Sequence, residues 1–196
     1  MAFTVPLPRT PFDGGTAQWY ENQLGWAAAD GPPVQLLTGL RFDVLELPAE
    51  VGAAVLRRLD LSGPVALMGR RMRLLVAAGS AEELPGLLDW LEWGAIDLDL
   101  TAIGAGGRMT APPPPGWPGS QGAAAWLRPP VPGREVEPTL PALAPLGNSA
   151  GYGGIPDFVR IVDTAATECH RVRLLRTNSP RARSANRAKS QPLAFS

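Results

Sequence analysis

The sequence predicts an α+β domain in which helices cover one face of a mainly antiparallel sheet. Three observations lead to this class. Short apolar runs of strand length are separated by Gly and Pro, two of these runs are close enough to form a hairpin, and only a few segments have helical spacing. With 196 residues, of which 45% are hydrophobic, the chain is expected to form one domain with tails.

The first predicted elements are one helix and two strands. Residues 1–15 are rich in Pro and Gly and are expected to be an irregular lead-in. Aromatic and leucine side chains at helical spacing then predict a helix over 16–26. Apolar runs predict strands over 34–38 and 40–47, with Gly39 as the turn between them.

A helix and a hairpin are expected next. Pro48 suits the first turn of a helix, because the N–H group that proline lacks has no partner there. The following apolar residues recur on one face and predict a helix over 48–59. The runs 65–68 and 72–77 predict two strands, with the Gly-Arg-Arg segment at 69–71 as their hairpin turn.

A second helix is predicted over 80–91. Ser80 and Glu83 have the spacing of a capping box, which indicates the start of this helix. Residues 95–103 then alternate apolar and polar side chains, which is the period of a half-buried strand.

A proline-rich loop is expected between the last two strands, 108–111 and 123–127. Four consecutive prolines at 112–115 exclude a helix or a central strand. The run resembles a polyproline ligand for an aromatic groove, but a simple loop is the favoured interpretation.

The domain proper is therefore expected to span residues 16–130. A Pro- and Gly-rich linker follows at 131–154, and apolar spacing predicts a C-terminal helix over 155–175. Residues 176–196 have the composition of a basic, disordered tail.

Bulk charge and targeting signals indicate a cytoplasmic protein. The chain has 18 basic and 18 acidic residues, which give no overall bias toward nucleic acid or membrane. Its one cysteine, Cys169, excludes an intrachain disulfide. We find neither a signal-peptide pattern nor an apolar run of about 20 residues that could span a membrane.

The distribution of charge is uneven at the C-terminal end. No acidic residue follows Glu168, whereas seven basic residues do. They are Arg171, Arg173, Arg176, Arg181, Arg183, Arg187 and Lys189. Such a run binds the phosphate backbone of DNA or RNA without sequence preference, and its plainer interpretation is a solvated chain end.

Two pairs of acidic residues are candidate metal ligands. Asp43 and Glu46 are three residues apart, so a regular strand points them to opposite faces. Asp97 and Asp99 would share a face of the 95–103 strand, about 6.5–7 Å apart. Two Mg²⁺ or Mn²⁺ ions held by shared carboxylates are typical of phosphoryl transfer. Independent surface or edge residues are the favoured interpretation of both pairs.

The strand and helix around Pro48 resemble part of a known family. The order of elements is similar to the primase–polymerase domain of bacterial bifunctional DNA primase/polymerases, in the archaeo-eukaryotic primase superfamily. That family has an Asp-x-Asp motif at the end of a strand, then a Gly-containing turn and a helix. The matching segment here is 44–52, with Glu46 at the first acidic position and Pro48, which cannot bind metal, at the second.

A second family pattern falls on the proline-rich loop. The family has a Gly-Gly turn, a short apolar strand and a Pro-Pro-Ser-x-His segment. In this sequence, 106–116 matches that stretch, with Pro114 at the Ser position and Gly116 at the His position. Neither residue has a side chain that binds phosphate. The resemblance covers roughly residues 16–130.

The resemblance implies a degenerate, non-catalytic copy of the domain, with a nucleic-acid-associated or regulatory role such as transcription regulation, and no cofactor. A first alternative is an active Mg²⁺- or Mn²⁺-dependent nucleotidyltransferase that uses Glu46, Asp97 and Asp99. A second is a protein-interaction module that acts through the proline-rich loop and the tail.

Overall fold

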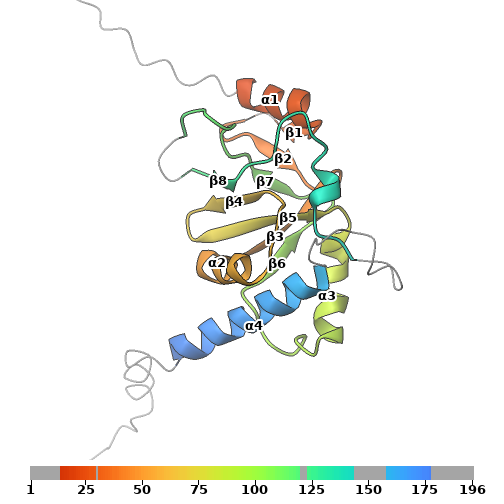
Figure 1. Cartoon of the computed structure of the whole chain (residues 1–196), viewed down its shortest axis with the longest axis vertical. Coiled ribbons are helices and arrows are strands. Elements are labelled where there is room, and N and C mark those ends of the chain that lie inside the picture. Colours follow the sequence, from red (N-terminus) through yellow and green to blue (C-terminus); the bar gives the residue numbers. More distant parts are fainter. Residues whose placement is uncertain (1–13, 30, 120–122, 144–157, 178–196) are drawn as a thin grey trace, which may run out of the picture.

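The structure is a computed structural model that describes residues 14–29, 31–119, 123–143 and 158–177. Helices pack against antiparallel strands, which confirms the predicted α+β class (Figure 1). The strands form two sheets, whereas the sequence predicted one.

The larger sheet has five strands in the order β6-β3-β5-β4-β8, and all neighbours are antiparallel. Its strands are β3 (Phe42–Pro48), β4 (Val65–Met68), β5 (Arg71–Ala77), β6 (Thr101–Ile103) and β8 (Ala125–Arg128). The predicted hairpin is confirmed as β4 and β5, because Met68 pairs with Arg71 across the turn.

Three helices cover one face of this sheet (Figure 1). They are α2 (Ala49–Arg58), α3 (Ser80–Trp90) and α4 (Phe158–Thr177). Their apolar faces form an aliphatic core with β3 and β5, in which Val55, Leu74 and Ile161 are fully or almost fully buried. The expected face of the helix after Pro48 is confirmed, since Val51, Val55 and Leu59 are buried.

The other face carries a smaller sheet and one helix. Strands β1 (Ala28–Ala29), β2 (Gln35–Leu37) and β7 (Arg108–Thr110) form this sheet, next to α1 (Gly14–Leu24). The core between them is aromatic: the Trp26 ring lies 6.0 Å from Tyr20 and 4.6 Å from Phe42, measured between centroids.

Strand β3 supplies both cores, because its side chains alternate between the two faces. Leu45 and Leu47 belong to the aliphatic core, and Phe42 and Val44 belong to the aromatic core. Asp43 therefore points toward the helices, and Glu46 points to the opposite face.

The predicted strand over 95–103 is wrong for most of its length. Only Thr101–Ile103 pair with a neighbour, as β6 beside β3. The preceding backbone is held by α4 instead: the Arg173 guanidinium donates to the Asp97 carbonyl, and the Cys169 thiol lies 3.6 Å from the Asp99 carbonyl. These two carbonyls therefore accept hydrogen bonds from side chains of α4 and not from the N–H groups of a neighbouring strand.

The predicted capping box of α3 is also wrong. Helix α3 follows Gly79, and no side chain within the Ser80–Glu83 segment caps it. Asp43 of β3 does so from a distance, since its Oδ2 accepts a 2.9 Å hydrogen bond from the Ala81 N–H.

Two further segments extend what the sequence indicated. Within the predicted linker, residues 131–143 include a short 3-10 helix, η1 (Glu137–Thr139), and they bury Val136 and Leu140 in the aromatic core. Helix α4 continues through Thr177, so Arg176 lies on the helix. Residues 1–13, 144–157 and 178–196 lie outside the described residues.

Candidate functional site

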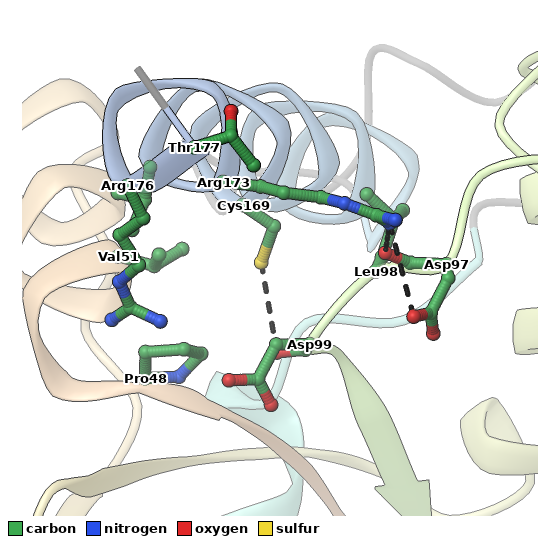
Figure 2. Close-up of a pocket in the computed structure, with 10 residues that line it drawn as sticks. Pro48, Val51, Asp97, Leu98, Asp99, Cys169, Arg173, Arg176 and Thr177 are labelled. Atoms are coloured by element: carbon green, nitrogen blue, oxygen red, sulfur yellow. Dashed lines mark hydrogen bonds and ion pairs between the residues drawn. The ribbon is translucent and has the colours of Figure 1, made fainter. Parts of the chain in front are cut away.

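The candidate site is a hollow of about 480 Å³ between α4, the start of α2 and residues 97–99 (Figure 2). Its apolar lining comes from Val51, Leu98 and Cys169, which belong to the aliphatic core or pack against it, and from Pro48. The end of β3 places Pro48 there, because α2 begins at the next residue.

A second hollow of about 630 Å³ adjoins the first and shares Pro48, Asp99 and Arg176 with it. It continues along the β4–β5 turn, where Arg70 and Arg71 lie. We call the two hollows together the cleft. The Ala49 N–H donates to the Arg70 carbonyl at 2.8 Å, so the hairpin turn is fixed against the first turn of α2.

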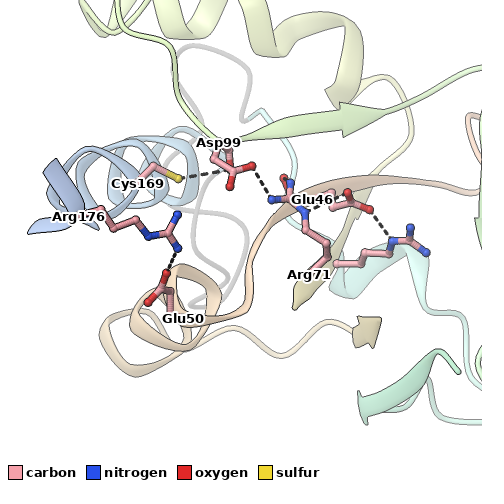
Figure 3. A network of polar contacts seen from close by, with 7 residues as sticks. Glu46, Glu50, Arg71, Asp99, Cys169 and Arg176 are labelled. Carbon is pink, nitrogen blue, oxygen red and sulfur yellow. Dashed lines mark hydrogen bonds and ion pairs between the residues drawn. The ribbon is translucent and has the colours of Figure 1, made fainter. Parts of the chain in front are cut away.

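Arginine and carboxylate side chains meet in three pairs around the cleft. Arg173 lies 3.8 Å from Asp97, Arg71 lies 2.5 Å from Asp99, and Arg176 pairs with Glu50 (Figures 2 and 3). Glu50 is in the first turn of α2, where a negative charge is stabilised by the helix dipole.

Arg71 connects the cleft to the sheet. Its Nε donates to Glu46 at 3.2 Å while its Nη1 reaches Asp99, so one guanidinium binds both carboxylates (Figure 3). Burial lowers the pKa of Arg71, but hydrogen bonds and charge attraction from Asp99 and Glu46 outweigh that effect and raise it. Arg71 therefore stays charged.

Glu46, the predicted first acid of the family motif, is part of an ion-pair network. Arg73 lies directly opposite it on β5 and donates from Nε at 2.7 Å. Both side chains are mostly buried, at 18% and 13% exposure. Two arginines therefore neutralise the Glu46 carboxylate from one side.

Asp43 lies on the opposite face of β3 from Glu46 and takes no part in the cleft. It is fully buried and caps α3. Burial raises the pKa of Asp43, the hydrogen bond from Ala81 opposes this, and the charge of Glu82 adds to it. Its position explains how a buried strand tolerates this acid.

Asp97 and Asp99 are both at the cleft, but they are not adjacent positions of a strand as predicted. Asp97 is 96% exposed and faces Arg173, whereas Asp99 faces Arg71. Among the described residues, no three His, Cys, Asp or Glu side chains are grouped so that they could hold a metal ion. The convergence that the nucleotidyltransferase alternative requires is therefore absent from this part of the chain.

The predicted basic residues are divided between α4 and the chain beyond it. Arg171, Arg173 and Arg176 are exposed on the last turns of α4, and the latter two line the cleft. Arg181, Arg183, Arg187 and Lys189 lie outside the described residues.

The proline-rich loop is anchored on the aromatic side of the molecule. The Tyr20 hydroxyl donates to the Pro112 carbonyl at 2.8 Å, and Trp126 donates to the same hydroxyl. Pro112 and Pro114 are buried. Neither Pro114 nor Gly116 lines the cleft, so the two family patterns do not meet in one hollow.

Cys169 is a buried thiol at the base of the cleft. Burial and the nearby Asp99 carboxylate raise the pKa of Cys169 to about 11, which keeps it protonated at neutral pH. Its neighbour His170 packs against Trp93, with ring centroids 5.9 Å apart. The two residues do not form a nucleophilic pair.

Sequence reasoning missed Glu50, Arg70 and Arg71 as cleft residues. The predicted hairpin could have indicated the two arginines, because its second strand, β5, pairs with β3 so that Arg71 lies opposite Pro48. A strand pairing that brings the turn beside Pro48 also brings its two arginines there.

No protein-family model matches the chain, and no match was found among curated proteins or solved structures. The resemblance to primase–polymerase domains therefore stays a prediction. In the part of the chain that the structure describes, no helix is long and apolar enough to cross a membrane.

Proposed function

We propose that this protein is a non-catalytic, nucleic-acid-associated protein that contacts the phosphate backbone through the end of α4 and the cleft. The observation that carries the proposal is the run of exposed arginines on α4, at the rim of a cleft that also holds Arg70 and Arg71. A primase–polymerase ancestry is part of the proposal and rests on the sequence resemblance.

Charge along the chain supports this role. Past Glu168 the sequence has seven basic residues and no acidic one, and α4 carries the first three of them. Arginine forms bidentate hydrogen bonds with phosphate, so this end of the molecule suits a polyanion without sequence preference.

The partners of the acidic residues support a non-catalytic role. Glu46 is bound by Arg71 and Arg73, and Asp99 is bound by Arg71. A metal ion at Glu46 would have to displace Arg73, which is mostly buried and pairs with no other carboxylate among the described residues, so this exchange is costly.

Binding of a labelled single-stranded oligonucleotide across a salt series tests the proposal. We expect the logarithm of the association constant to fall linearly with the logarithm of salt concentration. Replacing Arg173 and Arg176 by Gln should reduce the slope by about 1.4, since each lost phosphate contact contributes about 0.7.

The matched control carries Arg41→Gln and Arg108→Gln, two exposed arginines away from the cleft. This variant has the same net charge and should keep most of the slope. Equal losses in both variants, or binding that does not respond to salt, would contradict the proposed interface.

A protein partner is the second candidate, favoured by exposed leucines on the same helix. Leu174 and Leu175 are 48% and 64% exposed near the end of α4. Co-purification of a protein that survives nuclease treatment, and is lost when both leucines are replaced by Ser, would support this candidate over nucleic acid.

A further inference from the structure

Three arginines at the cleft have carboxylates of the same chain beside them. Arg176 pairs with Glu50, Arg173 with Asp97 and Arg71 with Asp99. The carboxylates come from α2 and from the segment before β6, so they reach the cleft from different parts of the chain. A phosphate that binds one of these arginines must therefore compete with the carboxylate that is already bound to it.

Two of the pairs are open to solvent. Arg176 and Glu50 are 56% and 52% exposed, and Arg173 and Asp97 are 50% and 96% exposed. Exposed ion pairs of this kind contribute little to stability, so an incoming phosphate can displace the carboxylate. The mostly buried pair of Glu46 with Arg73 offers no such exchange.

A displaced carboxylate stays close to the ligand, because the backbone of α2 or of the 97–99 segment still holds it. A free nucleotide that binds one arginine replaces the carboxylate with its own phosphate, and the displaced carboxylate then repels that phosphate. A strand with several phosphates meets the same repulsion at each paired arginine, but it contacts several arginines at once, and the gains add through multivalency.

We propose that Glu50 and Asp97 are affinity-setting residues, which compete with phosphate for Arg176 and Arg173 and so weaken binding at each arginine to a level that a multivalent nucleic-acid strand overcomes and a free nucleotide does not. This inference rests on the proposed function and adds the residues that set its affinity for phosphate. It requires that neutralising Glu50 and Asp97 strengthens anion binding more than neutralising two acidic residues away from the cleft does.

The test compares the full-length wild-type chain with the double variant Glu50→Gln and Asp97→Asn. The probes are a single-stranded oligonucleotide and ATP, measured at one salt concentration. Repulsion between two unit charges about 4 Å apart in water corresponds to roughly fivefold in affinity. An oligonucleotide that contacts both arginines is relieved of two such repulsions, so we expect the double variant to bind it up to about 25-fold more tightly, and to bind ATP at one arginine about fivefold more tightly. A wild-type protein that binds ATP as tightly as the double variant does would contradict the inference.

The control is the double variant Glu21→Gln and Asp60→Asn, which changes net charge equally on exposed residues away from the cleft. It should gain less than twofold for either probe. Thermal unfolding of all three proteins checks that the fold is intact.

The outcomes separate this inference from the proposed function. If wild type binds the oligonucleotide and both variants gain equally, the competing carboxylates are refuted while the interface stands. If only the cleft variant binds, the carboxylates do compete, and the proposed function of the natural protein is refuted. If no form binds, both are refuted.

Discussion

The two ends of β3 each carry an acidic residue, and they use it differently. Asp43, near the start, is fully buried and caps α3. Glu46, near the end, pairs with two arginines, and one of these, Arg71, lines a cleft where two other ion pairs are exposed. The carboxylates of β3 itself are therefore held in place by partners on the neighbouring strand and helix. The carboxylates farther from the sheet, Glu50 and Asp97, form exposed ion pairs that an incoming anion can replace.

The largest expected effect separates Glu46 from the exposed acids of the cleft. Replacing Glu46 by Ala leaves Arg73 mostly buried and without the carboxylate that binds it, so we expect the free energy of unfolding to fall by about 3 kcal/mol. Urea denaturation measures this loss. Glu50→Ala is the control, and a loss as small as the control's would mean that the Glu46 pair is not structural.

The second-largest loss of unfolding free energy is expected at Asp43. Replacing it by Ala removes the cap of α3 and leaves the Ala81 N–H without its acceptor, which should cost about 2 kcal/mol of unfolding free energy. Asp43→Asn keeps an acceptor oxygen and should cost less. Equal losses for the two variants would show that the hydrogen bond to Ala81 is not what stabilises this end.

The Asp43→Asn variant also gives a pH signature. Burial raises the pKa of Asp43, so the folded protein binds this proton more tightly than the unfolded chain does. The stabilisation is complete below the unfolded value of about 3.9 and is lost as pH rises through the folded value. Over that window wild type should lose stability relative to Asp43→Asn, and a constant gap between them would contradict the assignment.

The smallest effect is expected at the exposed pair. Replacing Asp97 by Asn breaks its contact with Arg173, but the Asp97 side chain is 96% exposed, so stability should change by less than about 0.5 kcal/mol. Urea denaturation at low and high salt checks this value. A loss near that of Glu46→Ala would remove the distinction between the two kinds of acid.

Local patterns predicted most of the elements. Apolar spacing placed the helix after Pro48, the β4–β5 hairpin and the C-terminal helix, because each buries a face that is visible within its own segment. The alternation over 95–100 was misleading. Its polar positions suit a half-buried strand, but the carbonyls of Asp97 and Asp99 are bonded by side chains of α4, a helix about 70 residues away.

The candidate site could be predicted only in part for the same reason. The uneven charge after Glu168 identified Arg173 and Arg176, because a run of one sign is visible in the sequence alone. Arg71 and Glu50 have no such signal. Their place at the cleft depends on the pairing of β5 with β3 and on the packing of α4 over α2.

By itself, then, the sequence determined the fold class, the principal helices and strands, and the basic end of α4, because periodicity and charge are properties of neighbouring residues. Only the tertiary structure decided which carboxylate caps a helix, which is neutralised within the sheet and which lie beside arginines at the cleft. That choice depends on strand register and helix packing, which bring together residues that are distant in the chain.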